Sequence, residues 1–295
     1  MERDLWRGVV SALKRLPRWW PRGAVYSNVQ VLAVLLWAAL HDRSISWACR
    51  RRSWPVQAWR RRLPDQSSMS RRLREPRLVA ELSRVLALVQ RARGPAAAPL
   101  ILDGKPLAVS AFSADPDARQ GWGAGRHATG YKLHVLIDRL QRLLAWEVRP
   151  MNEAECVVAA DLLREAAASG AVPRGAVALA DASYDSNPLH ARAAEVGVRL
   201  IAPRRRPERP LCKNRRHDPG RLASIAFTEH DPEWDHLRRR VRPEVERYFG
   251  SLASFGGGLF GLPPWARRLH RVRLWVGAKL VLNAARQAIR LRAAA

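Results

Sequence analysis

The sequence predicts an α/β fold in which a mixed sheet follows an all-helical N-terminal region. Residues 1–95 carry the spacing of apolar and capping residues that is typical of helices. Beyond residue 96, short apolar runs that suit strands alternate with helical stretches. The stretch Gly94-Pro-Ala-Ala-Ala-Pro marks the change and suits a linker. We therefore expect a helical domain over 1–95 and an α/β domain with a C-terminal helix over 96–295.

Basic residues are concentrated at the two ends of the chain. Lys and Arg number 52 against 26 acids among the 295 residues, and 47% of the residues are apolar, which indicates a globular chain. Residues 1–95 carry 20 basic and 6 acidic side chains, residues 96–200 carry 11 and 12, and residues 201–295 carry 21 and 8. Such an excess predicts a polyanionic partner, and double-stranded DNA is the usual one. A ribosomal-type or membrane-surface protein is the alternative.

The first 95 residues predict a series of helices. We expect them over 28–40 with Asn28 as the cap, from a capping Ser44 to about residue 51, over 65–74 and over 76–93, with a loop or short helix between Pro55 and Pro64. The basic helix capped by Asp65 resembles the recognition helix of a helix-turn-helix, although a solvated basic helix would have the same composition. Its candidate DNA-binding residues are Ser67, Ser68, Ser70, Arg71, Arg72 and Arg74.

The second region predicts strands and helices in a definite order. Antiparallel strands are expected over 99–109, 130–138 and 142–150, then a helix over 152–170, a strand over 175–181, a helix over 188–195 and a strand over 197–203. We expect an irregular segment over 204–240 and helices over 243–255 and 266–291. Three antiparallel strands followed by two parallel strands with helices is the order of the ribonuclease H-like fold.

Cysteine, histidine and apolar patterns exclude several classes of protein. Cys49, Cys156 and Cys212 form no C-x-x-C pair, so reduced thiols are expected and no zinc site. The most apolar stretch, residues 29–40, is shorter than the roughly 20 residues that cross a bilayer. The first residues do not resemble a signal peptide. These patterns predict no membrane partner and a cytoplasmic, nucleoid-associated bacterial protein.

Three acids are candidates for a metal site. Phosphodiester hydrolysis by two divalent ions, about 3.5–4 Å apart, requires carboxylates that converge from different elements. Asp103 follows an apolar strand, Asp181 ends the most apolar strand, and Glu246 lies on a later helix. Each acid has a simpler explanation as well: an Asp-Gly turn, a helix cap or turn, and a surface ion pair with Arg242, respectively. Together, however, the three acids predict a shared site for two ions.

At this point the sequence resembles the DDE transposases of bacterial insertion sequences. Four motifs occur in the family's order: Leu-Ile-Leu-Asp-Gly around Asp103, Gly-Tyr-Lys-Leu-His at 130–134, Leu-Ala-Asp-Ala-Ser-Tyr-Asp-Ser around Asp181, and Arg-x-x-x-Glu ending at Glu246. The acids are separated by 78 and 65 residues. The resemblance implies that Asp103, Asp181 and Glu246 are the catalytic and metal-binding triad, with two Mg²⁺ or Mn²⁺ ions. It also implies cleavage at transposon ends followed by strand transfer into target DNA.

The resemblance also suggests which residues contact DNA. Arg242 matches the family's arginine four residues before the glutamate, and we expect further contacts from Arg239 and Lys132. Asp185 also matches the family and is interpreted as a turn or supporting residue. Pairing of two transposon ends suggests a homodimer on DNA.

Two departures from the family pattern leave other functions open. Arg239 stands where the family often has Tyr, and Ala253 stands where it often has a DNA-contacting Lys. The alternatives are therefore a catalytically inactive, transposase-derived DNA-binding protein and a structure-specific nuclease on the same fold.

Overall fold

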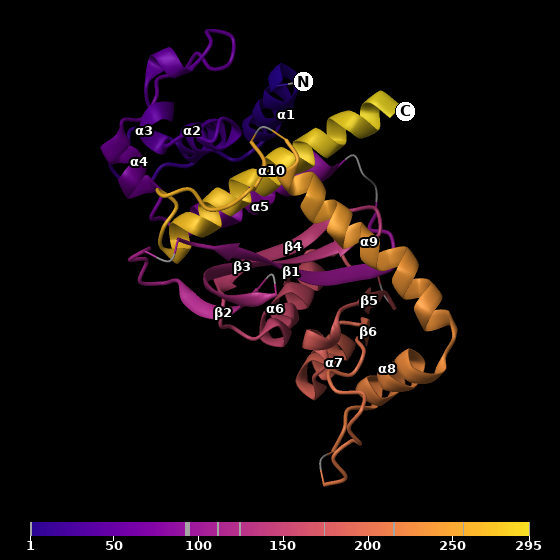
Figure 1. The fold of residues 1–295 in the computed structure, drawn as a ribbon. Coiled ribbons are helices and arrows are strands. Elements are labelled where there is room, and N and C mark those ends of the chain that lie inside the picture. The colour runs from indigo at the N-terminus through magenta and orange to yellow at the C-terminus, as the bar shows by residue number, and fades with distance from the viewer. Residues whose placement is uncertain are drawn as a thin grey trace. The chain divides into compact units, whose positions relative to one another are not determined.

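The chain forms two compact units in the computed structural model, which describes residues 2–91, 95–110, 112–123, 125–173, 175–214, 216–255 and 257–294. Unit 1 comprises residues 1–94, 114–117 and 250–295, and unit 2 comprises residues 95–113 and 118–249. Figure 1 labels the helices and strands of both units. None of the described helices is long and apolar enough to cross a membrane.

Unit 1 is built from helices. They are α1 (Glu2–Lys14), α2 (Asn28–Leu40), α3 (Ile45–Ala48), the 3-10 turn η1 (Arg51–Ser53), α4 (Gln66–Arg72), α5 (Arg77–Gln90) and α10 (Leu269–Ala294). Helix α2 is buried on nearly all sides, which fits its almost uninterrupted apolar sequence. Trp6, Trp37 and Trp54 pack together in the core, with ring centroids 4.6 to 5.7 Å apart.

Helix α10 packs on α5, α2 and α1, whereas we expected it to belong with the α/β domain. Its middle turns, residues 274–285, are buried almost without interruption. A helix that is apolar on nearly all sides needs neighbours on several sides, and the N-terminal helices supply them. The chain therefore returns to its first unit after completing the second.

Unit 2 contains one mixed sheet. Its strands are β1 (Leu100–Ala108), β2 (Arg119–Gly123), β3 (Arg126–Asp138), β4 (Leu143–Pro150), β5 (Val177–Leu179) and β6 (Arg199–Ile201). The sheet order is β2-β3-β1-β5-β6, and β4 pairs with β3. As the sequence predicted, β1, β3 and β4 are antiparallel, while β5 and β6 are parallel to β1.

Helices α6 (Glu155–Ala168) and α7 (Asn187–Glu195) cover one face of this sheet (Figure 1). The core between them is formed by buried apolar side chains of both layers, including Leu102, Leu163, Leu189 and Leu200. Unit 2 also contains the 3-10 turn η3 (Ala182–Tyr184), α8 (Pro219–His230) and most of α9 (Glu233–Ala253).

The structure corrects the sequence-based expectation in several places. Residues 204–240 are not irregular throughout, because α8 occupies 219–230 and α9 begins at Glu233. Pro243 lies inside α9 and not in its first turn. The many arginines before Pro243 conceal the helical spacing of the apolar residues Trp234, Val241 and Val245. Strand β2 was also missed, because Arg-Gln-Gly-Trp-Gly lacks an apolar alternation.

The caps of the early helices agree with the prediction except by one residue at α2. Ser27, not Asn28, caps α2, and it forms a capping box with Gln30. Ser44 and Asp65 cap α3 and α4 as expected. Residues 49–65 separate α3 from α4, which is longer than the three- or four-residue turn of a helix-turn-helix. The structure thus does not confirm a helix-turn-helix formed by α3 and α4, and the motif stays a prediction.

Candidate active site

Asp103 lies in the middle of β1, where its Cα is paired with Val135 of β3. Gly104 continues the strand opposite His134, so the Asp-Gly pair is not a hairpin turn. The Asp103 carboxylate accepts a hydrogen bond from its neighbour, with 2.7 Å between the Gly104 nitrogen and Oδ1. The side chain is thus held by a rigid strand and not by a mobile turn.

Asp181 lies two residues beyond the end of β5. It caps the turn η3, and its Oδ1 accepts a hydrogen bond of 2.7 Å from the Ser183 nitrogen. Ile101 of β1 is paired in parallel with Leu179 of β5. Two residues farther along each chain bring Asp103, within β1, to the position beside Asp181, just past the end of β5. The sheet register therefore brings these two acids together.

Both aspartates line a pocket of about 350 Å³. One wall is formed by residues 101–103 of β1 and by the end of β5, and Ser183 lies beside Asp181. The opposite wall is one face of α9, because Trp234, Arg238, Val241, Arg242 and Val245 recur at helical spacing. The pocket thus combines two carboxylates with two guanidinium groups and an apolar lining. This combination suits a phosphate-containing ligand held beside a cation.

Burial and neighbouring charge shift the pKa values of groups at this pocket. Burial raises the pKa of Asp103 to about 6, and the negative charges of Asp181 and Glu155 act in the same direction. The Gly104 N–H and the Arg242 guanidinium oppose this rise. Burial also raises the pKa of Tyr184 well above its usual value, and the same acids contribute. Asp103 is therefore a carboxylate whose negative charge is incompletely compensated by the protein.

Glu246 does not line this pocket. Its side chain is 69% exposed, and its Oε1 is 3.9 Å from Nε of Arg242. Arg242 and Val245, which precede it on α9, do line the pocket. Within the described ranges, no group of three or more acidic, histidine or cysteine side chains is placed to hold a metal ion. The structure therefore brings together two of the three predicted acids. The third, Glu246, lies outside the pocket, one residue beyond the pocket-lining Val245 on α9.

Glu155, which was not among the predicted site residues, begins α6 and lies beside the two aspartates. Its Oε1 is 2.6 Å from Nζ of Lys132, and its Oε2 accepts a hydrogen bond from Oγ of Ser183. The same Ser183 hydroxyl is 2.5 Å from Asp181 Oδ1. The only signal in the sequence was an acid in the first turn of a helix, which is common at helix starts. Glu155 connects Lys132 of β3 to the loop that carries Asp181.

The predicted DNA-binding residues of unit 2 differ in their exposure. Arg239 is exposed, and the Arg242 side chain is half exposed at the pocket. Lys132 is instead buried, with its ammonium group on Glu155, because β3 is a central strand of the sheet. A DNA contact by Lys132 stays a prediction, and the contact that is observed is internal.

The predicted DNA-binding residues in α4 and just after it also differ in their surroundings. Arg71 and Arg74 are exposed. Arg72 is buried, bonds to Glu75 and lies over the ring of Trp19, so its charge is used within unit 1. The remaining candidates are serines: the hydroxyls of Ser67 and Ser68 donate to the capping Asp65, and Ser70 lines a second pocket.

His134, of the Gly-Tyr-Lys-Leu-His motif, is buried in β3 without a hydrogen-bond partner for either ring nitrogen among the described residues. Burial, together with the charges of Lys132 and Arg149, lowers its pKa from 6.5 to about 3. Between pH 6.5 and about pH 3, His134 therefore binds a proton in the unfolded chain but not in the folded chain. His134 therefore reduces stability as the pH falls, by up to about 1.4 kcal/mol per pH unit.

We expect His134→Leu to remove this acid sensitivity. Urea unfolding at pH 7 and pH 5 should show that the variant loses less stability on acidification than the wild type. Asp103, with its raised pKa, acts in the opposite direction below pH 6, so the difference between the two proteins isolates the histidine. His127→Leu, at an exposed position of β3, controls for the loss of an imidazole. Equal pH dependence of wild type and His134→Leu would contradict the prediction.

Comparison with known proteins agrees with the class of site that the fold defines. Two aspartates on adjacent parallel strands, one within β1 and one just past the end of β5, face arginines across a pocket, which suits an enzyme that acts on phosphodiesters. A family model described as "Transposase DDE domain" matches residues 95–282. The chain belongs to this family of DDE transposases. A search of curated proteins and a search of solved structures found no match.

Proposed function

We propose that this chain is a metal-dependent DNA transposase that cuts transposon ends and joins them to target DNA. The observation that supports this most is the adjacent placement of Asp103, within β1, and Asp181, just past the end of β5, in one pocket. The strand order β4-β3-β1-β5-β6 is consistent with a ribonuclease H-like core. Membership of the DDE transposase family supports the same activity.

The donor atoms at the pocket suit Mg²⁺ or Mn²⁺. Asp103 and Asp181 offer hard carboxylate oxygens, and Mg²⁺ is commonly held by one or two carboxylates together with water and a substrate phosphate. The raised pKa of Asp103 indicates negative charge that a cation would compensate. Two bound divalent ions would polarise the phosphodiester and make water or a 3′-hydroxyl a better nucleophile. Asp103, Asp181 and Glu246 would hold these ions.

The other pocket residues have roles that follow from their positions. Arg242 and Arg238 would bind the non-bridging oxygens of the phosphate, which is a common function of guanidinium groups. Ser183 orients the Asp181 carboxylate by two hydrogen bonds, from its backbone nitrogen and its hydroxyl. The apolar side chains of Trp234 and Val241 would restrict water at the opposite wall.

Glu246 requires a side-chain movement to join the two aspartates. It lies next to Val245, which lines the pocket, and its partner Arg242 is half exposed. An exposed ion pair of this kind contributes about 1 kcal/mol or less, so a bound cation offers the glutamate a stronger partner. We propose that Glu246 leaves Arg242 when the cations bind, which also frees Arg242 for the phosphate.

The remaining parts of the proposal concern the partners. We propose that Arg71 of α4 and Arg74 just after it, both exposed, contact transposon ends and that two chains act together on the paired ends. Arg239 and Ala253 replace residues that many relatives have. Arg238 and Arg242 of the pocket are the cations available for the substrate phosphate.

A catalytically inactive DNA-binding protein is the second candidate, and the exposed position of Glu246 favours it. The test is incubation of the purified chain with a duplex that carries the element's end sequence, in Mg²⁺ or Mn²⁺, together with a target plasmid. A transposase yields nicked ends and joined products, whereas a structure-specific nuclease yields only nicks. Retained binding without nicking in either ion would favour the inactive protein.

A further inference from the structure

A strongly basic segment connects β6 to α8 and has no role in the site described above. Residues 203–218, which we call the basic arm, contain seven Lys or Arg side chains against two acids. Within unit 2 the arm extends away from β6 before the chain returns to α8 (Figure 1). Arg205, Arg206, Lys213 and Arg216 are exposed. A concentration of like charge on one loop costs free energy unless a polyanion compensates it.

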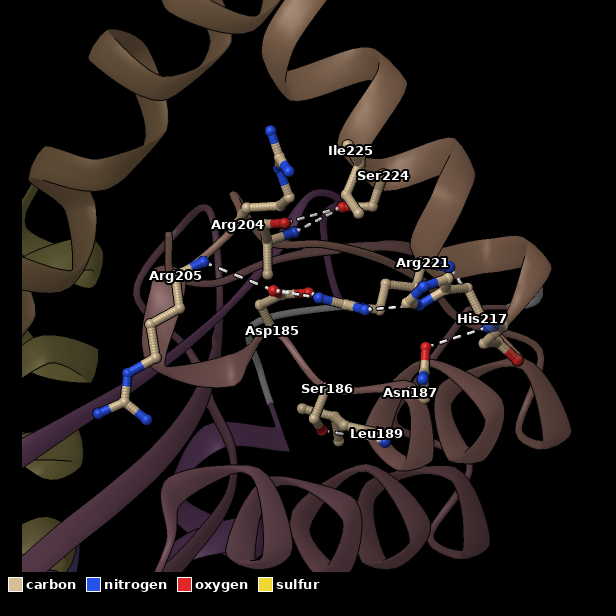
Figure 2. Close-up of polar contacts among 12 residues, drawn as sticks. Asp185, Ser186, Asn187, Leu189, Arg204, Arg205, His217, Arg221, Ser224 and Ile225 are labelled. Carbon is tan, nitrogen blue, oxygen red and sulfur yellow. Dashed lines mark hydrogen bonds and ion pairs between the residues drawn. The ribbon is translucent and has the colours of Figure 1, made fainter. Parts of the chain in front are cut away.

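The base of the arm is fixed by a buried ion pair. Asp185, whose side chain is 3% exposed, accepts two hydrogen bonds from Arg221 of α8, at 2.6 Å from Nε and 2.8 Å from Nη2. Figure 2 shows the side chains of Asp185 and Arg221 facing each other. A buried bidentate pair of this kind is geometrically specific. The arm is therefore attached to the same loop that carries Asp181, four residues earlier.

Further hydrogen bonds hold each end of the arm. The Ser224 hydroxyl of α8 bonds to both the nitrogen and the oxygen of Ala202, at 3.0 Å each. At the other end, Asn187 of α7 donates to the Arg216 carbonyl and accepts from the Asp218 nitrogen, at 3.2 and 3.0 Å. Both ends of the arm are thus secured to helices of unit 2.

One arginine is used to fold the arm itself. The guanidinium group of Arg204 donates to the carbonyls of Pro207 and Arg209, at 2.7 Å each, and pairs with Glu229 of α8. Its charge is therefore compensated within the protein, and it orders the first half of the arm. Arg204 behaves as a structural residue, unlike Arg205 and Arg206, which follow it and are exposed.

Four further cations of the arm are available to a ligand. Arg205, Arg206, Lys213 and Arg216 form no ion pair with any carboxylate in the part of the chain that the structure describes. In Figure 2 the guanidinium group of Arg205 points away from Asp185, and only its backbone nitrogen is directed toward that carboxylate. These side chains are exposed and ready to bind phosphates without first breaking an internal pair.

The arm begins at the wall of the candidate active site. Pro203, its first residue, lines the pocket that contains Asp103 and Asp181. A duplex whose phosphate lies in that pocket would continue past the pocket wall, where the arm starts. The arm starts at the pocket wall, is anchored by the Asp185–Arg221 ion pair, and carries exposed cations without carboxylate partners. From these three observations we infer that the basic arm binds the phosphate backbone of double-stranded DNA next to the cleavage site. This inference rests on the proposed function, because that function places DNA in the pocket.

The test compares two double substitutions that remove the same charge. Arg206→Ala with Lys213→Ala alters the arm, whereas Arg164→Ala with Arg192→Ala removes exposed arginines of α6 and α7 that pair with Asp161 and Glu195. The affinity of each variant for a duplex end is measured by fluorescence anisotropy at several salt concentrations, with EDTA present. For two lost phosphate contacts we expect several-fold weaker binding and a salt dependence shallower by roughly 1 to 2 in log–log slope.

Equal affinity and equal slope for the arm variant and the control variant would overturn the inference. Equally strong, arm-dependent binding of an RNA duplex of the same length would overturn the assignment to DNA. Because binding is measured without divalent ions, the result does not depend on catalysis. If the arm variant binds DNA more weakly but the wild-type chain never nicks DNA, the arm is a DNA-binding surface and the proposed transposase activity is refuted. If the wild-type chain nicks DNA but the arm variant binds DNA as the control variant does, the activity stands and the inference about the arm is refuted.

Discussion

Asp181→Asn is expected to lower the rate of Mn²⁺- or Mg²⁺-dependent nicking at least about 1000-fold. A carboxylate that holds the cations supports several kcal/mol of charge stabilisation in the transition state, and each 1.4 kcal/mol or so is a factor of ten in rate. Asparagine keeps the side-chain oxygen that accepts from the Ser183 nitrogen, so η3 should still form. The measurement is single-turnover nicking of a labelled duplex that carries the element's end.

Asp161→Asn is the matched control for this change. Asp161 is an aspartate of the same unit, on α6, with a side chain that is 41% exposed and paired with Arg164. The control should nick DNA at the wild-type rate, and both variants should unfold at nearly the wild-type temperature. Nicking that persists in Asp181→Asn at a rate within a few-fold of wild type would exclude Asp181 from the site.

Gly130→Ala is expected to destabilise the protein by about 2 to 4 kcal/mol, through overpacking against a backbone that cannot move aside. Gly130 is buried in β3 and paired with Ala108 of β1. A Cβ at this position would lie 2.3 Å from the Leu107 carbonyl oxygen and 2.9 Å from the Ala108 Cα. Relief would require β1 to move and its ladder with β3 to be disrupted. Urea denaturation followed by circular dichroism measures the loss.

Thr129→Ala, at the preceding position of β3, is the control because its side chain is exposed. A change of about 0.5 kcal/mol or less is expected there, as for most surface substitutions. If Gly130→Ala proved as stable as Thr129→Ala, the close approach of β1 to β3 would not be a feature of the folded protein in solution.

The sheet was predictable from the sequence to the extent that its strands are apolar runs. The strands that became β1, β3, β4, β5 and β6 were all expected, because runs such as Val-Leu-Ile and Val-Ala-Leu suit buried strands. The short strand β2 was not, since its glycines pack against other chain segments in place of side chains: a Cβ on Gly121 would be 2.3 Å from the Met151 carbonyl oxygen. That constraint is tertiary and leaves no local pattern.

The helices show the same division between local and tertiary signals. The caps at Ser44 and Asp65 are local, and they were predicted correctly. The packing of α10 on the N-terminal helices depends on a return of the chain to unit 1, which no local pattern encodes. Helix α9 continues through Pro243 because its face at Trp234, Val241 and Val245 is buried, and this burial outweighs the unfavourable proline.

The site was predictable where it depends on strand order. Asp103 and Asp181 each follow a short apolar run, and parallel pairing of β1 with β5 brings them together. The contact of Glu155 with Lys132 and Ser183 was not predictable, because it depends on the packing of α6 beside β3 and η3. The position of Glu246 relative to the aspartates depends on which rotamer its exposed side chain adopts, and spacing along α9 does not determine this.

The central claim is that Glu246 joins Asp103 and Asp181 in binding the cations. Calorimetric titration with Mn²⁺ tests it directly in the wild type, in Glu246→Gln and in the control Glu244→Gln, whose glutamate bonds to Gln141 and Arg247. We expect Glu246→Gln to weaken Mn²⁺ binding by roughly tenfold or more, because affinity depends on the number of charged ligands, while Glu244→Gln binds as the wild type does. Equal Mn²⁺ affinity in all three proteins would contradict the claim and leave Glu246 as a surface partner of Arg242.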